Sequence, residues 1–154
     1  MRRRSWLVVG VAGLLVGAFA LRHFAYADVV NGCYIAIRPS LVGDSGLTVK
    51  RALSTLRYGS PEDYRAVCTH VRTINPNPSC GGFGGGCFWR HEGNRGRATI
   101  DVSTEGGLVW TVALIVHETC HAIQFREGRP PGHDLEAECY RADDRILRAL
   151  VQFE

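Results

Sequence analysis

Two histidines in this 154-residue chain are spaced to bind one metal ion. In the segment His117-Glu118-Thr119-Cys120-His121 they stand four residues apart, which places both imidazoles on one helix face, one turn from each other. Glu118 directly follows the first histidine and can accept a proton from a metal-bound water. Coordination lowers the pKa of such a water to about 7, which provides a nucleophile at neutral pH. The spacing predicts a zinc site with His117 and His121 as ligands and Glu118 as general base.

The residues on either side of this motif indicate a buried helix. An apolar run extends from Leu108 to Phe125 and encloses the motif. Burying a polar group without a partner costs roughly a few kcal/mol, so the histidines and the glutamate need a chemical reason to lie there. Two exposed histidines on a helix surface are the alternative interpretation, and the apolar flanks argue against it.

A catalytic zinc site needs a third protein ligand and a position open to water. The next predicted helix, Asp134–Val151, carries Glu136 and Glu138 near its start. Around a helix these two side chains point roughly 200° apart, so only one of them can face the metal. Spacing alone leaves both open as the third ligand.

The motif and the downstream glutamate resemble those of the gluzincin metallopeptidases, in which H-E-x-x-H is followed by a glutamate on a second helix. Several gluzincin families show E-x-x-A-D on that helix, with the first glutamate as ligand. The resemblance implies that Glu136 is the third ligand, with Cys139 at the small-residue position and Tyr140 in place of the aspartate. In the family that aspartate supports the first histidine ligand. The candidates for this role here are Tyr140, Asp143 and Asp144.

The resemblance covers roughly residues 60–152 and implies an α+β, zincin-like fold of minimal gluzincin type. This fold has a small β-hairpin or sheet, the H-E-x-x-H helix and a C-terminal helix that bears the glutamate. The implied function is zinc-dependent hydrolysis of peptide bonds, with Zn²⁺ as cofactor and a peptide or protein as substrate. In zincins the strand before the motif helix is the edge strand along which the extended substrate lies. Thr99–Ser103 is the candidate here, within a stretch whose apolar and polar residues alternate as on a half-exposed strand.

Two other functions fit the same residues. One is a non-catalytic zinc-binding domain, although a structural site does not require Glu118. The other is a partner-specific processing factor in the cell envelope. The sequence does not distinguish an endopeptidase from an exopeptidase.

Hydrophobic spacing and turn residues predict the elements that position the site. The predicted helices are Gly46–Leu56, a helix from an N-cap at Ser60 to about Arg72, Leu108–Phe125, and Asp134–Val151 with Asp134 as N-cap. The predicted strands are Cys87–Trp89 and Arg97–Ser103, joined by a hairpin turn at Gly93–Gly96. Residues 28–42 are expected to be irregular or to form a short strand, and residues 75–87 to be an irregular, glycine-rich segment.

The cysteine content favours disulfides over a cysteine zinc site. The chain has six cysteines, an even number, and none of them forms a C-x-x-C pair. Cys80 and Cys87 flank the glycine-rich segment and can close it into a loop. A bridge between Cys120 and Cys139 would join the two ligand helices. The full pairing remains open at this stage.

The first 27 residues have the layout of an export signal. Arg2–Arg4 precede an apolar stretch of 16 residues, Trp6–Leu21, and Ala25-Tyr26-Ala27 has the small-x-small pattern that signal peptidase recognises. We expect cleavage after Ala27, so that residues 1–27 are a signal and residues 28–154 form the zinc metallopeptidase-like domain.

An uncleaved signal anchor is the alternative, with residues 6–21 in the membrane, although this run is short for a hydrocarbon core of about 30 Å. Either interpretation places the domain outside the cytoplasm, periplasmic or secreted. The paired cysteines agree with such an oxidising location.

The net charge of +3 gives no reason to expect a nucleic-acid partner. Residues 1–27 contain four of the 18 basic residues and none of the 15 acidic ones, so residues 28–154 carry a net charge of −1. Binding to nucleic acid depends on a basic surface, which a nearly neutral domain does not provide. The remaining length suits one domain.

Overall fold

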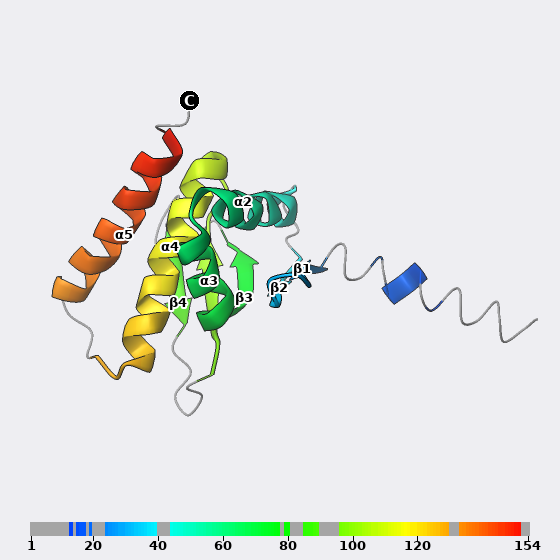
Figure 1. The fold of residues 1–154 in the computed structure, drawn as a ribbon, viewed down its shortest axis with the longest axis horizontal. Coiled ribbons are helices and arrows are strands. Elements are labelled where there is room, and N and C mark those ends of the chain that lie inside the picture. The colour runs from blue at the N-terminus through cyan, green and yellow to red at the C-terminus, as the bar shows by residue number, and fades with distance from the viewer. Residues whose placement is uncertain are drawn as a thin grey trace, which may run out of the picture.

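A five-stranded mixed sheet and the helices packed on it make up the fold (Figure 1). The computed structural model describes residues 13, 15–17, 19, 24–39, 44–77, 79–80, 85–89, 96–129 and 133–151. Its elements in chain order are β1 (Ala25–Asp28), β2 (Cys33–Ile37), α2 (Ser45–Gly59), α3 (Pro61–His70), β3 (Val71–Pro76), β4 (Gly86–Trp89), β5 (Ala98–Val102), α4 (Gly107–Arg126) and α5 (His133–Val151). The fold class is therefore α+β.

The strand order is β1-β2-β3-β5-β4. The central strands β2, β3 and β5 are parallel, and Ile74 on β3 lies opposite Ile100 on β5. The two outer strands, β1 and β4, run antiparallel to their neighbours. In the described part of the chain, β4 thus forms one free edge of the sheet and β1 the other.

The hairpin predicted between residues 87 and 103 is confirmed as a strand pair, because Trp89 of β4 lies opposite Thr99 of β5. Its turn, Gly93–Gly96, falls largely outside the described residues. The expectation that Thr99–Ser103 forms the free edge is wrong. Strand β5 pairs with β3 on one side and β4 on the other, so β4 is the edge strand.

Strand β3 is missed by the sequence analysis, as is β1, whose first three residues were assigned to the export signal. The segment Val71–Pro76 was expected to begin as helix and to continue as irregular chain, but it forms a strand. Its residues Val71, Thr73 and Ile74 are β-branched and favour extended backbone. Val71 and Ile74 are fully buried, so packing in the core adds to that preference.

The helices agree with the predictions except at their ends. Helix α2 is longer than expected, whereas α3 starts after Ser60 as predicted and stops at His70. The Ser60 hydroxyl donates to the Asp63 carboxylate at 2.6 Å and caps no backbone N–H. Helix α5 already includes His133, so Asp134 lies inside the helix and is not its N-cap.

Helix α4 packs against β4, β5, α2, α3 and α5, which makes it the central helix of the fold. Within the described residues it is also the helix long and apolar enough, by composition, to cross a membrane. Since 61% of its most apolar window is buried inside the protein, its apolar character is that of a core helix. The motif residues are carried by this helix.

Three disulfides connect these elements. They are Cys33–Cys68 between β2 and α3, Cys80–Cys87 before and within β4, and Cys120–Cys139 between α4 and α5. The prediction of disulfides is confirmed, as are the two pairings expected from the positions of the cysteines, Cys80–Cys87 and Cys120–Cys139. Such bridges stabilise a small domain chiefly by restricting its unfolded chain, and they persist in oxidising compartments.

A buried carboxylate at the end of β1 joins this strand to α2 and α3. Asp28 accepts hydrogen bonds from the Asn31 side chain at 2.7 Å and the Tyr64 hydroxyl at 2.8 Å, and it pairs with Arg57 at 3.2 Å. The Asn31 hydrogen bond, with smaller contributions from Tyr64 and Arg57, holds the pKa of Asp28 below its ordinary value, although burial acts in the opposite direction. The charged form of Asp28 therefore stabilises the fold.

This network predicts how stability depends on pH. Because the pKa of Asp28 is lower in the folded than in the unfolded chain, its contribution is present above the unfolded pKa of 3.8 and is lost as pH falls through the folded pKa. We expect the metal-free full chain to have a higher Tm than its Asp28→Asn variant at pH 7. The Tm difference should shrink below about pH 4. A Tm difference that is independent of pH between 7 and 3 would contradict this account.

Candidate metal centre

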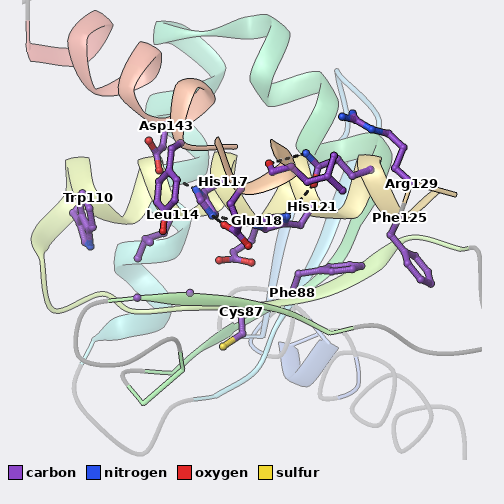
Figure 2. Close-up of a pocket in the computed structure, with 16 residues that line it drawn as sticks. Cys87, Phe88, Trp110, Leu114, His117, Glu118, His121, Phe125, Arg129 and Asp143 are labelled. Carbon is purple, nitrogen blue, oxygen red and sulfur yellow. Dashed lines mark hydrogen bonds and ion pairs between the residues drawn. The ribbon is translucent and has the colours of Figure 1, made fainter. Parts of the chain in front are cut away.

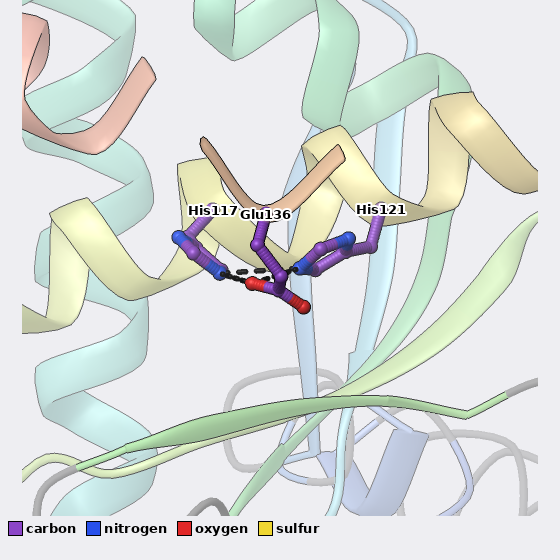
Figure 3. Close-up of side chains that lie close together, drawn as sticks. All are labelled: His117, His121 and Glu136. Carbon is purple, nitrogen blue, oxygen red and sulfur yellow. Dashed lines mark hydrogen bonds and ion pairs between the residues drawn. The ribbon is translucent and has the colours of Figure 1, made fainter. Parts of the chain in front are cut away.

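Helices α4 and α5 bring three potential ligands together. His117 and His121 lie one turn apart on α4, and Glu136 comes from the first turns of α5. Figure 3 shows the Glu136 side chain reaching from α5 toward both imidazoles. The Cys120–Cys139 disulfide joins the two helices close to these residues, since each cysteine is one or three positions from a ligand. The packing of two helices thus completes a site that neither forms alone.

The distances between the ligand atoms fit a single tetrahedral ion. The two Nε2 atoms of His117 and His121 are 3.2 Å apart. Oε2 of Glu136 is 3.6 Å from Nε2 of His117 and 3.4 Å from Nε2 of His121. A tetrahedral zinc ion with bonds of about 2.0–2.1 Å keeps its ligand atoms about 3.3 Å apart. The three residues are therefore already placed at the corners of such a coordination shell.

The far side of the His117 ring is held by a carboxylate. Nδ1 of His117 lies 2.9 Å from Oδ2 of Asp143, which is two turns beyond Glu136 on α5. A carboxylate can only accept a hydrogen bond, so Nδ1 carries the ring proton and its N–H group donates a hydrogen bond to Asp143. In the neutral ring, Nε2 of His117 then has a free lone pair that points into the site.

The far side of the His121 ring is held by an amide. Nε2 of Gln124 donates to the backbone oxygen of Leu135 at 3.0 Å and to Glu138 at 3.3 Å. Both partners are acceptors, so the amide oxygen is the atom that faces Nδ1 of His121, at 3.0 Å. This oxygen accepts a hydrogen bond from the Nδ1–H group of His121. The lone pair on Nε2 of His121 therefore also points into the site. Arg129 in turn pairs with Glu138.

Three hydrogen-bond acceptors thus converge on one point. They are the Nε2 lone pairs of both histidines and a carboxylate oxygen of Glu136, and no contact among the described residues supplies a donor between them. Three such groups repel one another unless a cation lies between them. Two imidazole nitrogens and a carboxylate oxygen are ligands that zinc prefers. The residues present therefore fit a divalent metal ion of the zinc type.

Glu118 lies beside this centre in a different environment. It is only 4% exposed, and burial raises its pKa to about 8, with further contributions from the Glu136 and Asp101 carboxylates. Gly86 of β4 packs directly against it, since a Cβ atom at Gly86 would lie 2.6 Å from Oε1 of Glu118 and 3.1 Å from the backbone oxygen of Asp101. The absence of a side chain at Gly86 leaves the space that the Glu118 carboxylate occupies.

A cavity of about 570 Å³ opens over the three ligands and Glu118. It is bounded by β4 below and by α4 and α5 above (Figure 2). Trp110 and Leu114 lie on one side of the histidines, and Phe88 and Phe125 on the other. The centre is thus open to solvent in the middle of a cleft with apolar residues at both ends.

The structure brings together all four residues that the sequence singled out: His117, Glu118, His121 and Glu136. Glu138, the alternative third ligand, instead contacts Gln124 and Arg129.

Among the residues considered for support of the first histidine, Asp143 bonds to His117. Tyr140 is 61% exposed, and its ring centroid lies 4.9 Å from that of His117. Asp144 pairs with Arg148. The seven-residue spacing from Glu136 to Asp143 is the signal that identifies Asp143, because residues i and i+7 share a helix face.

Sequence analysis missed two residues of the site, Gln124 and Gly86. Gln124 is three residues beyond His121, a spacing that places both on the same helix face and that could have identified it. Nothing local in the sequence relates Gly86 to Glu118, because their contact depends on how α4 packs on β4.

No protein-family model, curated protein or solved structure matches this chain. The assignment of the centre therefore depends on its own geometry.

The contact between Asp143 and His117 predicts a specific loss of metal affinity. Replacing Asp143 by Ala removes the acceptor that fixes the ring proton on Nδ1. We expect zinc affinity to fall about 10–100-fold, as is typical when a partner of a ligating histidine is removed. Competition titration against a chromophoric chelator measures the change.

Asp144→Ala is the matched control, because Asp144 is the next residue on α5, is exposed and pairs only with Arg148 in the described contacts. Equal affinities for the two variants would contradict the role assigned to Asp143.

Proposed function

We propose that this protein is a zinc-dependent metallopeptidase with His117, His121 and Glu136 as ligands and Glu118 as general base. The observation that carries the proposal is the convergence of three acceptor atoms, with no donor, beside a buried carboxylate in an open cleft. On this proposal the α+β fold is zincin-like and of minimal gluzincin type. The gluzincin pattern places the supporting aspartate four residues after the glutamate ligand, whereas Asp143 lies seven residues after Glu136.

Three protein ligands favour a catalytic site over a structural one. Structural zinc sites are generally closed by four protein ligands, whereas catalytic sites keep one position for water or substrate. When bound, the ion would lower the pKa of a water, polarise the scissile carbonyl and favour the charged form of the neighbouring Glu118. These effects supply the chemistry that peptide hydrolysis requires.

Glu118 is the residue that distinguishes catalysis from simple metal binding. It is not one of the three converging ligands, and its burial raises its pKa to about 8. A carboxyl group with a pKa near neutral pH is suited first to accept a proton and then to deliver it to the leaving amine. Burial of an acid costs desolvation free energy, and a role of Glu118 in proton transfer accounts for its position.

Strand β4 is the proposed binding edge for the substrate. Gly85 directs its carbonyl inward to the backbone N–H of Ser103 at 2.9 Å. Hydrogen bonding alternates along an antiparallel strand, so the backbone groups of Gly86 and Phe88 point to the free edge. Both residues also line the cavity. An extended peptide that pairs with this edge would lie across the metal centre.

The two apolar ends of the cleft indicate the kind of peptide that fits. On α4, Leu114 lies one turn and Trp110 two turns before His117, and Phe125 lies one turn after His121. Because the cleft continues on both sides of the centre, we infer cleavage at internal bonds flanked by apolar side chains. The three disulfides are consistent with activity in an oxidising compartment outside the cytoplasm.

Replacing Glu118 by Gln tests the proposed function directly. The amide keeps the shape of the side chain but cannot accept the proton, so we expect full zinc content with cleavage reduced roughly 10²–10⁴-fold. Zinc is measured by metal analysis, and cleavage with a library of quenched fluorescent peptides that contain apolar residues.

Glu136→Gln provides the contrasting variant, since it should lose zinc and activity together. If the wild type binds zinc but cleaves no peptide in the library, the proposal fails, and the non-catalytic zinc domain is favoured.

The close packing of Gly86 on Glu118 gives a second prediction. In Gly86→Ala the new methyl group would displace the Glu118 carboxylate, because the backbone of Asp101 leaves no space on the other side. We expect cleavage to fall at least about 10-fold while zinc affinity is unchanged, because small shifts of a catalytic group are costly.

Gly46→Ala serves as control, since its Cβ would make an ordinary 3.7 Å contact with Ile37. Unchanged cleavage in Gly86→Ala would show that the position of Glu118 is not set by this contact.

A further inference from the structure

The peptide bond expected to be cleaved by signal peptidase lies inside the folded sheet. Ala25, Tyr26 and Ala27 form the first three residues of β1 and lie opposite Ala36, Ile35 and Tyr34 of β2. Cleavage after Ala27 would remove all three residues and leave only Asp28 of this strand. Strand β2, which carries buried core residues, would then become the exposed edge of the sheet.

Tyr26 contributes more than backbone pairing. Its hydroxyl lies 3.1 Å from that of Tyr64, the two rings meet edge to face at 6.3 Å between centroids, and Tyr26 packs against the hydrophobic core. Tyr64 also donates to Asp28, so Tyr26 and Asp28 hold the same tyrosine from two positions on β1. A strand with these contacts belongs to the domain and not to a disposable leader.

The apolar residues that the structure describes before β1 are exposed. Leu15 and Val16 are helical and are 66% and 68% exposed. In Figure 1 the described residues around them lie well away from the sheet and helices. Exposed apolar surface is unfavourable in water at about 25 cal/mol per Å² and is stable in a lipid interior.

We propose that the chain is retained uncleaved and anchored in a lipid bilayer through residues 6–21, with the metal centre on the outer side. Arg2–Arg4 would stay in the cytoplasm under the positive-inside rule. A helix of 17 residues, the number between Arg4 and Arg22, would be about 25 Å long, and arginine side chains at its two ends could extend to the two interfaces. Only residues 22–24 then separate the apolar run from β1, which places the domain next to the membrane surface. This inference does not depend on the metal centre.

The full chain expressed in an export-competent bacterial host tests the proposal. We expect the intact mass of the protein to be that of the complete chain, about 17.0 kDa, and the protein to stay in the membrane pellet after alkaline carbonate extraction. A mature protein that begins at Asp28, or at any residue that removes the run 6–21, would overturn the proposal.

Ala27→Gln is the matched control for processing. Ala27 is exposed on β1, so the fold accepts a larger side chain there, but signal peptidase does not accept it at this position. We expect wild type and variant to have the same mass, apart from the substitution. A shorter wild type beside an intact Ala27→Gln protein would show that cleavage occurs.

A second arm measures whether β1 is part of the domain. In the detergent-solubilised full chain, Tyr26→Ala should lower Tm by roughly 5 °C or more, because it removes a ring that packs on the core. Val29→Ala is the control, since Val29 follows β1 and is exposed. Equal Tm values for Tyr26→Ala and wild type would overturn the claim that β1 is needed by the fold.

Discussion

Repulsion among three acceptor atoms is the constraint on which the rest of this structure depends. The lone pairs of His117 and His121 and the carboxylate of Glu136 point at one another across 3.2–3.6 Å. Without a cation between them, this arrangement is unfavourable, and its two histidines are carried by the mostly buried helix α4. The protein keeps the arrangement because α4 and α5 are fixed to each other by other contacts. An ion that binds there therefore meets a site already formed.

Several of those other contacts lie directly beside the centre. The Cys120–Cys139 disulfide joins the two helices, Asp143 holds one imidazole, and Gln124 holds the other. Each fixes a tautomer or an orientation and so reduces the reorganisation required when a metal binds. On the opposite wall, Gly86 leaves room for Glu118, so that the sheet contributes to the position of the proposed base. Helices α4 and α5 and strand β4 thus stabilise the fold and also fix the geometry of the site.

The sequence predicted those parts of the site that depend on local spacing. His117, Glu118 and His121 are brought together by one helix. Spacing left both Glu136 and Glu138 open as the third ligand, and only the resemblance implied Glu136. Sequence reasoning failed where the arrangement depends on distant pairing. Thr99–Ser103 has the alternating pattern of a half-exposed strand, but the parallel pairing with β3, itself missed, places β5 inside the sheet. The cleavage pattern at Ala25–Ala27 is likewise local, whereas its place in β1 depends on pairing with β2.

Anomalous diffraction at the zinc absorption edge, from crystals of the protein grown with zinc, tests the central claim most directly. The account predicts one strong peak at about 2.0–2.1 Å from Nε2 of both His117 and His121 and within about 2.2 Å of a Glu136 oxygen. The Glu118 side chain should lie outside the ligand distance. No peak between these three residues, or a peak bound instead through Nδ1 of either histidine, would contradict the convergence of acceptors from which the function is inferred.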